Sequence, residues 1–329
     1  MTVRARAPVR LDLAGGWTDV PPFSTREGGM VVSSAIGLSA SAEVSPRESG
    51  FRLVSEDLNH ELEAADATAL SPGGPLVLLQ AALRVCPAGP CTLVTRSDAP
   101  PGSGLGSSGA LDVAMVAALS AARGASLGPG EIAELACRLE AVEAGLPGGR
   151  QDQYTAAFGG VVRLGFRDPA VEVEPLQLDP EFLEELARRT VLCYTGASRF
   201  SGATIGRVMR AYEVGHPGIG AALHGLRDAA DRMTGALRAG DPAAVGRILL
   251  DNWRHQQALD PAMCTAGMAR LEQAMRAAGS LGGKAAGAGA GGSMFFLAPD
   301  DPAPMIEAAR SLDVRVLPVR WSKEGVRWC

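Results

Sequence analysis

A glycine-rich turn at residues 101–108, Pro-Gly-Ser-Gly-Leu-Gly-Ser-Ser, holds the residues of this sequence that are best suited to chemistry. Residues with high β-propensity precede it at 91–95, and an apolar run of good helix formers follows at 110–122, which predicts a strand, a tight loop and a helix. Glycine lets a backbone approach an anion closely, and the first turn of a helix offers unpaired N–H groups at the positive end of its dipole. The stretch therefore predicts a loop that binds phosphate.

Three other interpretations of this loop are weaker. A flexible connector would need neither the proline pair that stiffens its entry nor the apolar helix directly after it. Residues 104–109 match G-x-G-x-x-G, but a dinucleotide fold needs a second strand about 20 residues on, where residues 130–144 read as a helix. A Walker loop fails because Lys284 is followed by alanine instead of the serine or threonine that would bind Mg²⁺.

Polar residues near the N-terminus form a second candidate group. Arg10 and Asp12 alternate with apolar residues over 9–13, and this alternation places both side chains on one face of a strand. A solvated edge strand explains the alternation alone, but not the Gly-Gly turn that follows and delivers Asp19. The carboxylate of Asp19 is suited to accept hydrogen bonds from ligand hydroxyls.

Carboxylates in the middle of the sequence form a third group. Asp152 follows a Gly-Gly turn at 148–149 and is a candidate base, although aspartate also serves often as a helix N-cap. Glu140 and Glu143 lie three residues apart on the expected helix 130–144. They are either two solvated surface acids or the source of one metal ligand.

The composition is ordinary for a soluble enzyme, with 329 residues, 20% charged residues and a net charge of −5. This acidity, and the lack of a basic run interleaved with aromatics, disfavours nucleic acid as a partner. The apolar runs are shorter than the ~18 residues of a membrane span. Six cysteines without a C-x-x-C pair favour free thiols in a reducing cytoplasm. We expect a cytoplasmic monomer or homodimer that binds a small molecule.

The order of expected elements is typical of the α+β class. Strands are expected early, then two helices, further strands, a mainly helical stretch, and a second glycine-rich loop between a helix and a strand. The expected strands are 9–13, 29–36, 51–54, 91–95, 160–166, 171–176, 190–194, 293–297 and 314–319. The expected helical regions are 109–123, 130–144, 180–189, 203–252, 261–278 and 302–312, and the second loop is 282–292.

Three motifs, at residues 8–19, 101–108 and 284–293, occur in the order in which GHMP small-molecule kinases carry them, and the chain resembles this family. Ala-Gly-Gly-Trp-Thr-Asp-Val-Pro-Pro at 14–22 and Gly-Gly-Arg-Gln-Asp-Gln at 148–153 most resemble the sugar 1-kinase branch with L-fucokinase and D-glycero-D-manno-heptose 7-phosphate kinase. The resemblance implies a two-domain α/β fold. Residues 1–185 would form a ribosomal-protein-S5-like, ATP-binding domain, and residues 186–329 a ferredoxin-like domain.

The resemblance also implies the reaction. The chain would use ATP and Mg²⁺ to phosphorylate the anomeric hydroxyl of a heptose 7-phosphate or of a related sugar such as fucose or mannose. Two alternatives stay open: a kinase of a non-sugar alcohol such as mevalonate, and a catalytically silent sensor of the same fold.

Carried over residue by residue, the resemblance assigns roles to positions of this sequence. Asp152 would be the base or orienting carboxylate, Arg10 would neutralise charge near the transferred phosphoryl group, and Ser108 with Glu140, or Glu143 in its place, would bind the metal. The ATP phosphates would contact Pro101, Gly102, Ser103, Gly104, Leu105, Gly106, Ser107 and Ser108. The acceptor would contact Thr18, Asp19, Gly149, Gln151, Arg199, Gly287 and Gly289. For Gly287 and Gly289, close packing between the loop and the strand is an equal alternative.

Overall fold

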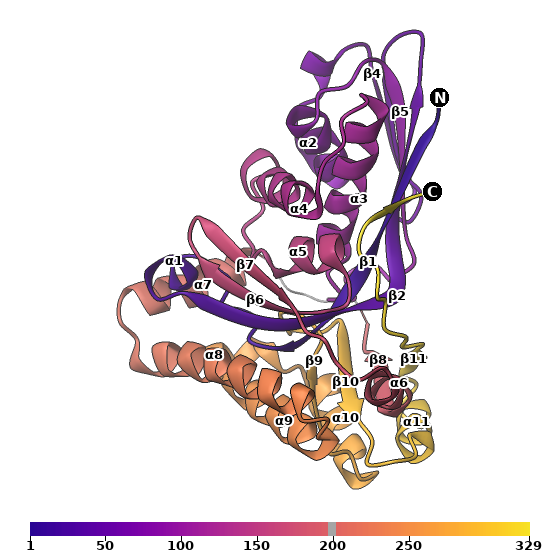
Figure 1. Ribbon diagram of the computed structural model, residues 1–329. Coiled ribbons are helices and arrows are strands. Elements are labelled where there is room, and N and C mark those ends of the chain that lie inside the picture. Colours follow the sequence, from indigo (N-terminus) through magenta and orange to yellow (C-terminus); the bar gives the residue numbers. More distant parts are fainter. Residues whose placement is uncertain (197–201) are drawn as a thin grey trace.

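The computed structural model describes residues 1–196 and 202–329, and two β-sheets organise them (Figure 1). The first sheet has the order β12-β1-β2-β5-β3-β4, with β6 and β7 joined through β2. The second has the order β11-β8-β10-β9 and is antiparallel. The strands of the first sheet are β1 (Val3–Ala14), β2 (Gly29–Pro46), β3 (Phe51–Ser55), β4 (His60–Ala64), β5 (Cys91–Ser97), β6 (Val161–Arg167), β7 (Ala170–Pro175) and β12 (Arg327–Trp328). Those of the second are β8 (Thr190–Tyr194), β9 (Gly282–Ala285), β10 (Ser293–Leu297) and β11 (Arg315–Leu317).

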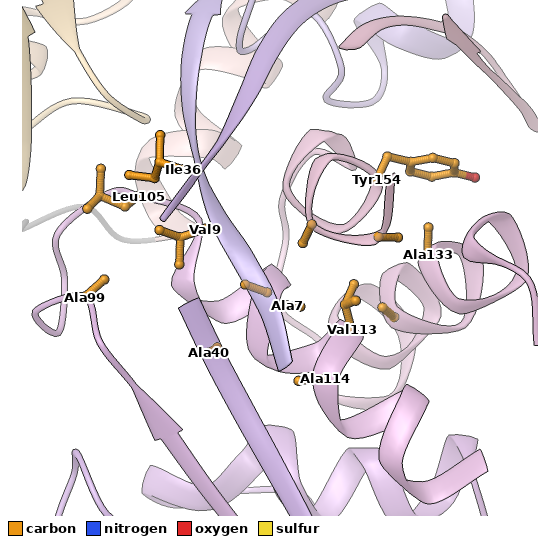
Figure 2. Close-up of a cluster of buried hydrophobic side chains, with 14 of the residues drawn as sticks. Ala7, Val9, Ile36, Ala40, Ala99, Leu105, Val113, Ala114, Ala133 and Tyr154 are labelled. Carbon is orange, nitrogen blue, oxygen red and sulfur yellow. The ribbon is translucent and has the colours of Figure 1, made fainter. Parts of the chain in front are cut away.

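Helices α2, α4 and α5 of the N-terminal half pack against α3 (Ser107–Ala122), whose central residues are buried. Its run of alanine, valine, leucine and methionine is apolar on every face, and residues 113–119 are all 0% exposed, as expected for a helix in the centre of a core. Figure 2 shows side chains of β1, α3, α4 and α5 gathered in this core. The helices of this half are α1 (Phe23–Arg26), α2 (Val77–Val85), α3 (Ser107–Ala122), α4 (Pro129–Arg138) and α5 (Gln151–Phe158).

The helices of the C-terminal half pack on the second sheet and on the first (Figure 1). A separate cluster of apolar side chains joins Trp17 and Phe23 of the N-terminal half to α7 and α8. The last residues of the chain return to the first sheet, where Arg327 pairs with Arg6 of β1. The helices of this half are α6 (Pro180–Arg189), α7 (Gly202–Glu213), α8 (Pro217–Arg238), α9 (Pro242–Leu259), α10 (Ala266–Ala277) and α11 (Ala303–Arg310).

The boundary between residues 185 and 186 stays a prediction. It falls inside α6, which lies between β7, in the first sheet, and β8, in the second. No helix in the described ranges is long and apolar enough to cross a membrane.

Three expected elements differ in the structure. The helix expected over 130–144 ends at Arg138 and continues as a π-helical turn, Leu139–Glu143. The helix expected over 261–278 is divided into a 3₁₀ turn, Pro261–Met263, and α10, because Thr265 caps a new helix start by accepting from the Met268 N–H.

The second glycine-rich segment begins as strand β9 and not as a loop. A Cβ on Gly282 would lie 1.8 Å from the Gly246 carbonyl oxygen of α9. These glycines therefore let a helix and a strand approach closely, which the sequence pattern alone does not distinguish from a loop. The elements that were not expected from the sequence are helices α1, α2 and α5 and strands β4 and β12.

Candidate active site

A cavity of about 550 Å³ lies between the N-terminal half and the glycine-rich segment of the C-terminal half. Most of the residues assigned above line it: Arg10, Asp19, Gly102, Ser103, Gly104, Gly106, Ser107, Ser108, Glu140, Gly149, Gln151, Asp152, Gly287 and Gly289. Pro101, Leu105 and Thr18 are not among its lining residues. Arg199 lies outside the described residues.

The glycine-rich turn forms one wall of the cavity. Gly102, Gly104 and Gly106 all have left-handed backbones, with φ of 66°, 72° and 73°, a conformation that side chains other than glycine rarely adopt. Gly106 is the N-cap of α3, so the helix begins at Ser107, beside the cavity. The unpaired N–H groups of the first turn and the positive end of the dipole are therefore available to an anion.

Two assigned residues of this turn have other contacts. Leu105 is fully buried in the core, and its carbonyl accepts a hydrogen bond from the Arg10 N–H at 2.9 Å. The carbonyl of Pro101 accepts from the Tyr194 hydroxyl at 3.3 Å. Both support the shape of the turn from outside the cavity.

Arg10 and Asp152 form a two-point ion pair at the centre of the site. The Arg10 Nε and Nη2 atoms donate to the two carboxylate oxygens of Asp152 at 2.7 and 2.9 Å. The remaining terminal nitrogen, Nη1, donates to the carbonyls of Gly104 at 2.7 Å and Ala286 at 2.8 Å. Burial opposes the charged form of Arg10, but Asp152, together with Asp12 and Asp19, outweighs it and raises the pKa of Arg10, so this cation stays charged.

Asp152 is not a helix cap. It lies in the first turn of α5, whose N-cap is Arg150. A Cβ on Gly109 would lie 2.6 Å from the Asp152 Cβ, and one on Gly106 would lie 3.1 Å from its carboxyl carbon. Because Gly106 and Gly109 lack a Cβ, the Asp152 carboxylate can approach the glycine-rich turn.

Glu140 faces the cavity from the π-helical turn. Burial, followed by repulsion from Asp152, raises the pKa of Glu140 to about 7, although hydrogen bonds from Ser108 and Gln153 oppose the rise. Glu143, by contrast, does not line the cavity and pairs with Arg138 at 3.4 Å. The geometry thus favours Glu140 over Glu143 as a metal ligand.

The donor set suits magnesium better than a metal held by protein alone. No group of three or more His, Cys, Asp or Glu side chains in the described part of the chain is arranged to hold a metal ion. Mg²⁺ is usually bound by one or two carboxylates together with substrate phosphates and water. Glu140 supplies one carboxylate, which is hydrogen-bonded to the Ser108 hydroxyl beside the glycine-rich turn. This arrangement fits that mode of binding.

Asp19 also lines the cavity, next to Gly149. Its Oδ2 accepts from the Gln151 N–H at 3.0 Å, and burial raises the pKa of its carboxyl to about 6. A Cβ on Gly149 would fall 1.9 Å from this oxygen. The neighbouring Thr18 is fully buried, where its hydroxyl contacts the Gly15 carbonyl at 2.7 Å and accepts from the Met30 N–H at 3.0 Å. Thr18 therefore fixes the turn that carries Asp19.

Sequence reasoning missed one pair of charged residues at this site. Lys284 of β9 donates to Asp12 of β1, which lines the cavity. The alternation over 9–13 placed Asp12 on the same face as Arg10, but nothing in the sequence linked it to a lysine 272 positions away.

Two domains of one protein family match the chain. The GHMP kinases N terminal domain matches residues 76–160, and the GHMP kinases C terminal domain matches residues 233–313. These ranges include the glycine-rich turn, Asp152 and the second glycine-rich segment.

Individual proteins are similar over most of the chain. D-glycero-alpha-D-manno-heptose 7-phosphate kinase of Campylobacter jejuni is 32% identical, over 99% of this chain and 98% of its own length. The bifunctional fucokinase/GDP-fucose pyrophosphorylase of Arabidopsis thaliana is 29% identical over 90% of this chain, which spans only 30% of that longer protein. The crystal structure of a D-glycero-D-manno-heptose 1-phosphate kinase from Bacteroides thetaiotaomicron superposes with a TM-score of 0.80 at 28% identity, covering 99% of this chain and 98% of that one. This chain belongs to the GHMP kinase family, whose members are ATP-dependent phosphotransferases that act on alcohol groups.

Proposed function

We propose that the protein transfers the γ-phosphoryl group of ATP to a sugar hydroxyl. The favoured acceptor is the anomeric hydroxyl of a heptose 7-phosphate, with fucose and mannose as related candidates. The observation that carries the proposal is the Asp152 carboxylate, fixed by two hydrogen bonds from Arg10 and facing the glycine-rich turn at the start of α3. The similarity to a heptose 7-phosphate kinase over nearly the whole chain supports the choice of sugar.

The residues of the site would act by position and charge. Phosphoryl transfer needs little covalent chemistry from a protein, so alignment of the two substrates and stabilisation of charge supply most of the catalysis. The turn at 102–106 and the N-terminus of α3 would hold the phosphates. Asp152 would orient the acceptor hydroxyl and receive its proton, and Arg10 would keep that carboxylate in place and lower the negative potential around it.

Ser108 and Glu140 would hold Mg²⁺ together with the ATP phosphates. When bound, the ion neutralises negative charge on the phosphates. The raised pKa of Glu140, about 7, reflects an excess of negative charge and burial around this carboxyl. A cation beside Glu140 would favour its ionised form, so binding of the metal nucleotide at neutral pH should release protons.

A phosphate-transfer screen tests the proposal. Purified protein is incubated with MgATP and, one at a time, heptose 7-phosphate, fucose, mannose, mevalonate and homoserine, and ³¹P NMR locates each new ester. We expect a sugar 1-phosphate ester. Turnover should be about 10²–10⁴-fold lower in Asp152→Asn, the usual effect of removing one well-placed catalytic group. Turnover of mevalonate or homoserine with none of any sugar would refute it.

A further inference from the structure

We propose that Asp12 is a further acceptor-binding residue, which takes a hydrogen bond from a sugar hydroxyl, and that the buried Lys284 is the positioning residue that holds it. This inference rests on the proposed sugar kinase function and names the chemistry that the acceptor wall recognises.

The pair lies where the two halves of the protein meet. The Lys284 Nζ atom donates to the Asp12 Oδ2 atom at 2.8 Å and to the Asp12 backbone carbonyl at 2.7 Å. Both side chains are buried, with 0% of Lys284 and 3% of Asp12 exposed. The ammonium also lies 5.7 Å from the centre of the Phe295 ring. Lys284 thus fixes the orientation of the Asp12 carboxylate through one of its oxygens.

The other oxygen of Asp12 is left without a partner. Across the described ranges, no group donates a hydrogen bond to Asp12 Oδ1, although it is buried and Asp12 lines the cavity. A buried carboxylate oxygen without a donor is costly, so a pair with only a structural role would be expected to satisfy both oxygens. A ligand hydroxyl supplies the missing donor.

Two neighbouring side chains share this property. Asp19 Oδ1 and Gln151 Oε1 are buried acceptors that, within residues 1–196 and 202–329, also lack a donor, and both residues line the same cavity. Gly16 and Gly149 leave room for the two carboxylates, because a Cβ on either glycine would lie within 2.2 Å of an aspartate oxygen.

Three acceptors on one wall define the ligand chemistry. They require a substrate end that brings several hydrogen-bond donors close together, as neighbouring sugar hydroxyls do. They disfavour a carboxylate or phosphate at that end, because two aspartates already lie there and like charges repel. A phosphorylated sugar would therefore bind with its hydroxyl-bearing ring against Asp12, Asp19 and Gln151 and its phosphate directed elsewhere.

The test uses the double variant Asp12→Asn/Lys284→Met, which removes both charges and leaves no buried charge alone. With heptose 7-phosphate as the probe, we expect the KM for the sugar to rise about tenfold to a hundredfold, the loss of one charge-assisted hydrogen bond. The KM for ATP should change less than about twofold, because the altered residues face the acceptor.

Deoxy analogues of heptose 7-phosphate, each lacking one hydroxyl, identify the partner. For one analogue, the KM should be about tenfold or more above that for heptose 7-phosphate with the wild-type protein. With the double variant the same comparison should give less than about twofold, since the two changes remove the same hydrogen bond. Arg189→Met is the matched control. Arg189 is also a buried cation, bonded to Glu185 and to the Ala298 carbonyl, but it does not line the cavity, so its loss should lower stability without changing the KM for the sugar.

The outcomes separate the two proposals. A double variant with the wild-type KM for heptose 7-phosphate, or one that discriminates among the deoxy analogues as the wild type does, overturns the role of Asp12 and leaves the sugar kinase function standing. A wild-type protein that phosphorylates mevalonate but no sugar overturns the proposed function, and the role of Asp12 with it.

Discussion

The two glycine-rich loops that meet in the cavity are similar in composition, but Gly104 of the first and Gly287 of the second are glycine for different reasons. In the first loop, at 102–106, Gly104 has a left-handed backbone next to open space, because a Cβ there would meet nothing closer than 3.8 Å. In the second, at 286–292, glycine allows contact between backbones: a Cβ on Gly287 would lie 2.4 Å from the Gly104 carbonyl oxygen. Gly104 therefore leaves space on the cavity side of the first loop, and Gly287 lets the second loop pack against the first.

Arg10 connects the two loops. Its Nη1 atom donates to Gly104 of the first loop and to Ala286 of the second, while the rest of the guanidinium holds Asp152. One side chain thus sets the spacing between the first loop, the second loop and the Asp152 carboxylate.

Breaking this connection should have the largest effect. In Arg10→Lys the flat guanidinium is replaced by a single ammonium, which cannot bind both carboxylate oxygens and both loops. We expect kcat to fall about 10²–10³-fold, measured at saturating ATP and sugar. Arg238→Lys, which alters a surface pair with Glu174, is the control and should be near wild type. An Arg10→Lys variant within threefold of the wild-type kcat would contradict the bridging role.

Neither loop contains a titratable side chain. Any pH dependence of stability that arises at this site therefore comes from the other residues that line the cavity, such as Asp19. Burial raises the pKa of Asp19 to about 6, from 3.8. The folded protein therefore binds this proton more tightly than the unfolded chain, and the stabilisation that results is complete below pH ~4 and is lost as the pH rises through about 6. A shift of this size corresponds to at most about 3 kcal/mol.

Urea unfolding between pH 4 and pH 7.5 measures this effect against Asp19→Asn, which cannot titrate. The free energy of unfolding of the wild type, relative to the variant, should decline over that range by up to about 3 kcal/mol. Parallel curves for the two proteins would show that Asp19 has an ordinary pKa.

Gly287→Ala should mainly lower the free energy of unfolding, whereas Gly104→Ala should mainly raise the KM for ATP. Gly287→Ala forces a methyl group into the backbone of the first loop and should lower the free energy of unfolding by about 1–3 kcal/mol. Gly104→Ala meets open space, so it should cost only the strain of a left-handed backbone, about 1 kcal/mol, but should raise the KM for ATP. Equal effects on both stability and KM would remove the distinction between the loops.

The smallest expected effect concerns the helix that follows the first loop. Ser108→Ala should raise the Mg²⁺ concentration needed for half-maximal turnover by about tenfold, the loss of one ligand or hydrogen bond, with little change in Tm. Ser120→Ala, on the same helix but outside the cavity lining, is the matched control. Normal turnover of Ser108→Ala at low Mg²⁺ would remove Ser108 from the metal site.

Features encoded by neighbouring residues could be predicted from the sequence. The first loop and helix α3 followed from a run of glycines between a β-forming segment and an apolar helix. The helices between 203 and 252 and strand β10 followed from local patterns in the same way. The family resemblance, which rests on the order of three such motifs, agrees with the matches to both GHMP kinase domains.

Features that depend on distant contacts could not be predicted. Taken without the other motifs, Asp152 is more typical of a helix cap than of a catalytic carboxylate, and the sequence does not show that Arg10, 142 positions away, lies against it. Thr18 and Asp19 are adjacent in sequence, yet the hydroxyl of one is used by the backbone and the carboxylate of the other reaches the cavity. Glu140 lines the cavity and Glu143 does not, although both lie in one π-helical turn, which the sequence pattern did not predict.

A crystal structure with a non-hydrolysable ATP analogue, Mg²⁺ and heptose 7-phosphate tests the central claim most directly. We expect the triphosphate to lie against residues 102–108. One sugar oxygen should lie within hydrogen-bond distance of the Asp152 carboxylate and in line with the γ-phosphorus and its leaving oxygen. A nucleotide bound away from this loop, or a sugar whose hydroxyls do not reach Asp152, would contradict it.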